Sequence, residues 1–174
     1  MKDSPYDRPA VIETLASFVR NVSPAPENGS VGAGRLARTV ESPVSNPARA
    51  AFEVICRRNT TKDDPKIDLR GCDLRGMYCE DANLAGVDFS NSHLGQSHFP
   101  RADMRNAHFM RTKLYDVWFT EADLSGSGFP EAEMAGCMFQ NAVLDGANLC
   151  VARGITEDSL QIAKSYEGAE FPWM

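Results

Sequence analysis

The feature that most constrains this chain is a repeat with a period of five residues. From Leu69 to Leu149 every fifth residue is apolar, which makes seventeen successive apolar positions. Two residues before each of them the side chain is small in fifteen of the seventeen cases, and Ile67 and Met77 are the exceptions. The register does not slip between residues 67 and 151. A repeat of this regularity decides the fold before any local element is assigned.

A period of five matches neither regular secondary structure. An amphipathic helix needs apolar residues at a spacing of about 3.6, and a half-buried strand needs alternation by two. A large and a small apolar residue two positions apart do lie on the same face of a short extended segment, after which the chain must turn before the next pair. The repeat therefore predicts an all-β solenoid.

Three segments show the repeat most clearly: Ala82-Asn83-Leu84-Ala85-Gly86, Ala122-Asp123-Leu124-Ser125-Gly126 and Ala147-Asn148-Leu149. They resemble the pentapeptide-repeat family. The resemblance implies a right-handed quadrilateral β-helix of about four coils, with four pentapeptides to a coil and both the large and the small residue pointing inward. Met77 and Cys79 reverse the usual order of small and large, so we expect a local distortion there.

Phenylalanine recurs within the repeat in a way that predicts the core. Six of the nine Phe residues are ten positions apart. Four pentapeptides to a coil place Phe89, Phe109 and Phe129 in one inner stack, and a second stack opposite it holds Phe99, Phe119 and Phe139. Leu and Met fill the other two sides, so we expect a filled core without an internal ligand pocket.

The flanking segments predict helices at both ends. Residues 9–20 carry Val11, Leu15, Phe18 and Val19 at helical spacing behind Pro9. A second helix is expected from Asn46 to Arg58, covering the first coil, and a third within residues 155–164, capping the last one. The expected division of the chain is an amino-terminal helix and Pro/Gly/Ser-rich linker (1–45), a capping helix and lead-in (46–66), the β-helix (67–151), and a helix with an apolar tail (152–174).

Charge and composition exclude several classes of function. Lys and Arg number 18 against 24 Asp and Glu, a formal charge of −6. Direct binding to nucleic acid is not expected of such a chain, because clustered cations drive it. No apolar run reaches the roughly 18 residues of a membrane span, and the amino terminus lacks a secretory signal, so we expect a cytoplasmic protein without a membrane partner.

Nothing in the sequence predicts catalysis. The five cysteines form no CxxC pair, and no His lies at zinc-ligand spacing from them, so we expect neither metal nor cofactor. His93, His98 and His108 each precede a large core position, where the repeat points side chains outward. Phosphate loops, nucleophile elbows and HExxH motifs are missing from the sequence, so we predict a non-enzymatic protein that binds a protein partner.

Two outer surfaces are candidates for binding. Steps of twenty residues from Tyr78 give an apolar, aromatic stripe of Tyr78, His98, Trp118 and Met138. It is either an exposed binding surface or the seat of the amino-terminal helix. The second surface is acidic, because residues 114–151 hold no Lys or Arg and six carboxylates: Asp116, Glu121, Asp123, Glu131, Glu133 and Asp145. It is either a solubilising surface or, by resemblance to the gyrase-protecting quinolone-resistance branch of the family, a mimic of DNA that binds DNA gyrase.

The apolar tail is a candidate for self-association. Phe171, Trp173 and Met174 close the chain and are too few to bury themselves. The gyrase-binding proteins of the resembled family pair through their carboxyl-terminal ends. We therefore expect a homodimer through the tail.

Overall fold

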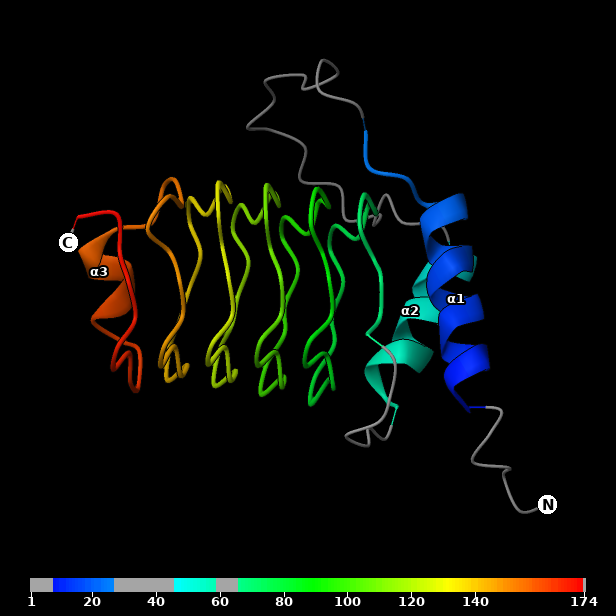
Figure 1. The fold of residues 1–174 in the computed structure, drawn as a ribbon, viewed down its shortest axis with the longest axis horizontal. Helices are drawn as coiled ribbons and strands as arrows, with labels where there is room; N and C mark the ends of the chain where they lie inside the picture. Colours follow the sequence, from blue (N-terminus) through cyan, green and yellow to red (C-terminus); the bar gives the residue numbers. More distant parts are fainter. Residues whose placement is uncertain (1–7, 27–45, 59–65, 174) are drawn as a thin grey trace.

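The structure is a computed structural model that describes residues 8–26, 46–58 and 66–173. Two helices, α1 (Arg8–Val22) and α2 (Asn46–Cys56), lie together across one end of a solenoid, and the short helix α3 (Glu157–Leu160) lies at the other end (Figure 1). None of the helices in these ranges is long and apolar enough to cross a membrane.

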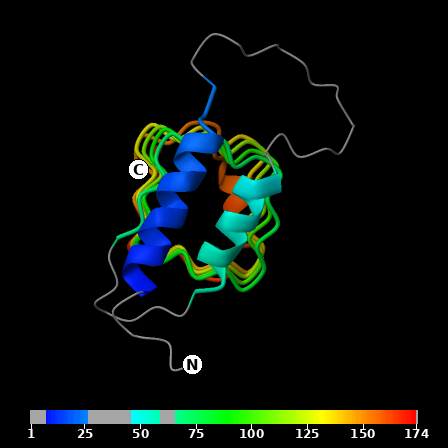
Figure 2. The same cartoon turned by 90° about the vertical axis from the view of Figure 1, so that its right-hand side faces the viewer.

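Parallel backbone bridges between residues twenty apart define the solenoid and give each coil four sides, one per pentapeptide (Figure 2). We number the sides by the outward-facing residues that bridge them. Side 1 holds Asp68, Asp88, His108, Gly128 and Asn148; side 2 holds Asp73, His93, Lys113, Glu133 and Arg153; side 3 holds Tyr78, His98, Trp118 and Met138; and side 4 holds Asn83, Asp103, Asp123 and Val143. Side 2 thus carries both acidic and basic side chains along one ladder.

The inward positions of the repeat form the core. All seventeen large positions and all seventeen preceding small positions are at most 5% exposed. Where the small residue is Ser or Thr, its hydroxyl is satisfied inside the wall: Ser92 Oγ donates to the carbonyl of Leu69 at 2.7 Å, and Thr112 Oγ1 to that of Phe89 at 2.9 Å. The burial pattern predicted from the repeat is confirmed.

The two phenylalanine stacks are also confirmed. Ring centroids are 5.4 Å apart between Phe89 and Phe109 and 4.8 Å apart between Phe109 and Phe129, with nearly parallel planes. The opposite stack has spacings of 6.1 Å and 5.6 Å through Phe99, Phe119 and Phe139. Phe109 meets Phe119 edge to face at 6.4 Å, so the stacks contact each other across the core.

The distortion expected at Met77 and Cys79 is not present. His98 N–H donates to the Met77 carbonyl at 2.8 Å, and Cys79 N–H donates to the His98 carbonyl at 2.9 Å. Both side chains are buried. The coil therefore accepts the larger Met77 at the small position and the smaller Cys79 at the large position without losing backbone hydrogen bonds to the next coil.

A left-handed residue makes each corner of the coil. It lies two positions after the large core residue, and from Gly71 to Gly146 every such position has a positive φ. Six are Gly and ten are other residues, mostly Asp, Asn, Glu and Arg. Charged side chains are consequently displayed at the corners, between the sides.

Helix α1 packs through a face that only partly matches the predicted one. Ala16 and Val19 are buried and Ile12 is partly buried, whereas Val11 and Phe18 are exposed. Of the four predicted residues, Val19 is therefore in the core and Leu15 packs partly buried against it, so the contact face is shifted along the helix surface and not replaced. Packing against α2 and the first coil determines which of these apolar side chains are buried.

Both helical segments supply partners for the open edge of the first coil. After α1, Pro24 forms an antiparallel bridge with Cys72, and Asp73 N–H donates to the Ser23 carbonyl at 2.7 Å. At the end of α2, the Cys56 carbonyl accepts from Asn83 N–H at 2.8 Å. Unpaired edge groups invite aggregation, and these bonds occupy them. The remainder of the expected linker, residues 27–45, lies outside the described residues.

The ladder continues beyond residue 151 at the other end. Ser165 bridges Val143 and Glu170 bridges Asn148, with an offset of 22 residues in place of 20. The two extra residues are accommodated around α3, which has four residues and begins at an N-cap made by Thr156. The helix is shorter than the expected 155–164, because the chain returns to the ladder at Lys164.

Candidate binding surfaces

The aromatic stripe of Tyr78, His98, Trp118 and Met138 is assembled on side 3. Successive members are bridged through the backbone, so their side chains follow one another along the solenoid. The His98 and Trp118 rings stack with centroids 4.5 Å apart and planes 3° from parallel, and Tyr78 lies 6.2 Å from His98. Burial lowers the pKa of His98, so its imidazole is uncharged at neutral pH.

The amino-terminal helix does not lie over this stripe. Arg20 of α1 donates to the Asp68 carbonyl on side 1, and the segment after α1 pairs with side 2. Tyr78, Trp118 and Met138 are 56%, 43% and 47% exposed. The sequence left open whether the stripe is exposed or covered by the amino-terminal helix. Within the described part of the chain, the stripe is exposed.

Carboxylates border the stripe at both corners of side 3. Asp116 lies at the corner before this side, and Glu80, Asp81 and Glu121 lie at the corner after it. We call these four carboxylates the acidic rim. Arg101 lies at the same corner as Glu121 but is bound to Asp81 at 2.8 Å and Glu80 at 2.5 Å. Among the described residues no ion pair involves Asp116 or Glu121.

The six carboxylates predicted as a DNA-like surface do not share one face. Each occupies a different position around the coil: Glu133 is on side 2, Asp123 on side 4, and Asp116, Glu121, Glu131 and Asp145 at four different corners. No two of them stack on adjacent coils.

Neighbouring coils also compensate part of this acidic charge. Arg111 binds Glu131 at 3.1 Å and lowers its pKa, and Arg105 lies 3.8 Å from Asp123. Asp145 accepts from the backbone N–H of Glu167 at 2.8 Å. Residues 114–151 contain no Lys or Arg, but arginines about twenty positions earlier, on the preceding coil, pair with some of their carboxylates.

Comparison with known proteins agrees with this geometry. The family model described as pentapeptide repeats matches eight copies between residues 66 and 152, half of the chain. The chain belongs to the pentapeptide-repeat family. It is therefore a pentapeptide-repeat scaffold, and its four-sided solenoid is the right-handed quadrilateral β-helix of that family.

Solved pentapeptide-repeat structures resemble it in part. HetL, involved in heterocyst differentiation regulation in the cyanobacterium Nostoc sp. strain PCC 7120, is 28% identical with a TM-score of 0.48 over 49% of this chain and 36% of its own. A thylakoid-lumen protein of Arabidopsis thaliana is 29% identical with a TM-score of 0.43, over 56% and 59%. QnrB1, a plasmid-mediated fluoroquinolone resistance protein, is 19% identical with a TM-score of 0.29, over 60% and 50%. The matches span less than two thirds of these proteins, and no curated protein matches the chain significantly in sequence.

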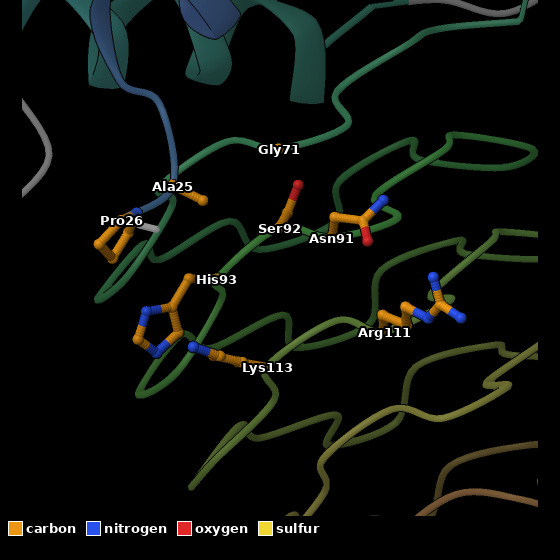
Figure 3. Close-up of a pocket in the computed structure, with 8 residues that line it drawn as sticks. All are labelled: Ala25, Pro26, Gly71, Asn91, Ser92, His93, Arg111 and Lys113. Carbon is orange, nitrogen blue, oxygen red and sulfur yellow. The ribbon is translucent and has the colours of Figure 1, made fainter. Parts of the chain in front are cut away.

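A hollow of about 240 Å³ lies on the outside of the pentapeptide repeat at side 2, beside the segment that follows α1. His93 and Lys113, on successive coils, line it together with Ala25 and Pro26 (Figure 3). Burial, and then the charge of Arg75, lower the pKa of His93 to about 4. The repeat places His93 outward like the other histidines, but the sequence does not reveal that residues 25 and 26 lie beside it.

The tail residues predicted to make a dimer differ in their surroundings. Phe171 is 3% exposed and stacks on the Trp173 ring with centroids 5.3 Å apart, whereas Trp173 is 41% exposed. Phe171 therefore belongs to the core of the last coil. Met174 lies outside the described residues.

The cysteines of the pentapeptide repeat are free thiols, and their surroundings differ. Cys72 and Cys137 are buried, and burial raises the pKa of each to about 12. Cys150 is exposed at the surface. In the described ranges no group of three or more His, Cys, Asp or Glu residues is placed to hold a metal ion.

Proposed function

We propose that this pentapeptide-repeat protein is a non-enzymatic scaffold that binds a protein partner through the aromatic stripe of side 3. The main observation in support is that Tyr78, Trp118 and Met138 are exposed and lie along one unbroken ladder of bridged residues. Scattered apolar residues on a surface need no explanation, but a contiguous patch marks an interaction site. Trp and Tyr are also the residues that most often dominate binding energy at protein interfaces.

The rigidity of the wall supports the same proposal. Trp118 N–H donates to the Ser97 carbonyl at 3.0 Å, and the Trp118 carbonyl accepts from Phe99 N–H at 2.9 Å. The next residue, Phe119, is fixed in a core stack. The stripe is thus held in place before a partner arrives, which reduces the entropy lost on binding.

The test compares proteins captured by the wild type with those captured by the triple variant Tyr78→Ser, Trp118→Ser, Met138→Ser. The matched control is Met110→Ser, since Met110 is exposed to a similar extent at a corner outside the stripe. A partner lost by the stripe variant and retained by the control, then reproduced with both purified proteins, supports the proposal. Capture of the same partners by all three proteins refutes it.

A second candidate function is that of a DNA mimic that binds DNA gyrase. It is favoured by the absence of Lys and Arg from residues 114–151, which leaves the carboxyl-terminal coils acidic in sequence. Such binding should weaken steeply with salt. Glu121→Lys, Asp123→Lys and Glu131→Lys together should abolish an effect on gyrase supercoiling while the β-helix stays folded. A wild-type protein that neither inhibits gyrase nor relieves its poisoning, at low salt, eliminates this candidate.

Self-association through the carboxyl-terminal end is a separate proposal. Trp173, Tyr166 and Ile162 are exposed near this end, and we propose that a second copy covers them. Trp173→Ser should convert a dimer into a folded monomer by light scattering. An unchanged mass removes the tail as the interface, and Trp118→Asp is the next variant to test.

A further inference from the structure

The charge around the aromatic stripe specifies what kind of partner it suits. Four rim carboxylates border side 3, namely Glu80, Asp81, Asp116 and Glu121. The described corners of this side also hold two guanidiniums, those of Arg75 and Arg101, and Arg75 is paired with Asp73 of side 2 at 2.5 Å. Because Arg101 is bound to two of these carboxylates, it offers little repulsion to an incoming cation. An apolar surface between excess negative charges is complementary to a basic ligand.

We infer that the stripe receives a basic segment of its protein partner, with an arginine side chain against Trp118 and its charge balanced by Asp116 and Glu121. The inference rests on the proposed function and adds the chemistry of the partner to it. A planar guanidinium both stacks on an indole and forms hydrogen bonds with carboxylates, which a lysine ammonium does less well.

The neighbours of Trp118 in the ladder determine which face of its indole a partner can reach. His98 covers one face of the indole at 4.5 Å with parallel planes, so the opposite face is turned toward the coil of Met138. Met138 is exposed, and its unbranched side chain adapts easily to a ligand. An arginine of the partner would reach this face of the indole by displacing the Met138 side chain.

The position of the carboxylates supports the same arrangement. Asp116 and Glu121 are on the same coil as Trp118, two residues before it and three after it, and both are exposed. A cation over Trp118 therefore meets one carboxylate at each corner. The imidazole of His98 is uncharged at neutral pH, because burial lowers its pKa, and so it adds no positive charge to the site.

The test uses two synthetic peptides that differ only in charge. One has arginine at alternate positions with serine between, and the other has citrulline, the neutral isostere, in place of each arginine. Binding is followed through the Trp118 indole N–H resonance, identified by its loss in Trp118→Phe. The second tryptophan, Trp173, is an internal control for non-specific effects.

We expect the arginine peptide to shift the Trp118 resonance, with the Trp173 resonance unchanged, and to bind at least about fivefold more tightly than the citrulline peptide. Trp118→Leu, or Asp116→Asn with Glu121→Gln, should remove most of this difference. Asp145→Asn, on another corner, should leave it intact. Each of these results supports the inference.

Equal binding of the two peptides, or no binding by either, overturns the basic-partner inference. Retention of the difference in the Asp116→Asn, Glu121→Gln variant overturns it as well. The capture experiment with the serine variants is independent of these peptides. If it still shows a partner lost only from the stripe variant, the scaffold proposal stands while the basic character of the partner is refuted.

Discussion

Replacing Phe109 by alanine tests the stacked core directly. Phe109 is fully buried, and its ring is stacked between Phe89 and Phe129 and meets Phe119 edge to face. Truncation of a core Phe to Ala costs about 3–5 kcal/mol of unfolding free energy. Each aromatic pair adds about 0.5–1.5 kcal/mol beyond the area that it buries.

The backbone prevents the resulting void from closing. Phe109 N–H donates to the Gly128 carbonyl at 2.8 Å, and His108 N–H donates to the Val87 carbonyl at 2.9 Å. These bonds set the spacing of the coils, so neighbouring rings cannot move together to fill the space. We therefore expect Phe109→Ala to lose about 4–5 kcal/mol, the upper part of the range for such a truncation.

Denaturant titration followed by circular dichroism measures the loss. Phe109→Leu, which keeps most of the volume but removes the ring contacts, should cost about 1–2 kcal/mol. Met110→Ala, at the exposed next residue, should change stability by less than about 0.5 kcal/mol. A loss below about 1 kcal/mol for Phe109→Ala, or equal losses for the Ala and Leu variants, contradicts the stacked core.

Three further results are expected. Gly154→Ala should cost about 2 kcal/mol or more in thermal or chemical denaturation, because its Cβ would lie 2.9 Å from the Ala135 backbone nitrogen at a φ of +79°. Gly86→Ala, with open space around it, should cost only about 1 kcal/mol, and equal losses would contradict the argument. The unfolding free energy should fall as pH is lowered from 6.5 to about 4, because His93 takes up a proton in the unfolded chain over that window and stays neutral in the folded protein, where its pKa is about 4. If His93→Gln has the same slope of unfolding free energy against pH as the wild type, this explanation is wrong. A thiol reagent should label one cysteine rapidly in the native protein, and Cys150→Ser should abolish that fast phase, whereas rapid labelling of a second thiol would contradict the burial of the others.

The repeat alone predicts most of the wall because its geometry is local and periodic. Each pentapeptide decides which of its side chains point inward, and the next coil lies twenty residues away, so Phe109 meets Phe89 and Phe129 without information from elsewhere. The membership of the aromatic stripe follows from the same twenty-residue spacing, whereas its exposure does not, because the sequence leaves open whether the amino-terminal helix covers it. Its acidic borders follow as well once the corner residues are recognised, since Asp116 and Glu121 flank Trp118 in the sequence.

The ends of the solenoid depend on contacts that no period describes. The helical spacing on α1 predicts an apolar face that includes Val11 and Phe18, but packing leaves these two exposed and buries Ala16 and Val19. The bridge between Pro24 and Cys72 joins segments separated by residues without a repeat. The offset of 22 residues at Ser165 arises because the chain leaves the ladder around α3 and returns to it.

The sequence by itself determined the solenoid, its filled aromatic core and the identity of the side chains on each outer face, because neighbours in the wall are separated by a constant number of residues. Only the tertiary structure decided how those faces combine. It spread Asp116, Glu121, Asp123, Glu131, Glu133 and Asp145 over different sides and corners, and it compensated some of them with arginines from the preceding coil. Charge counted along a chain includes every side of the coil, whereas a partner meets only the sides that face it, and the winding of the chain sets which charges those are.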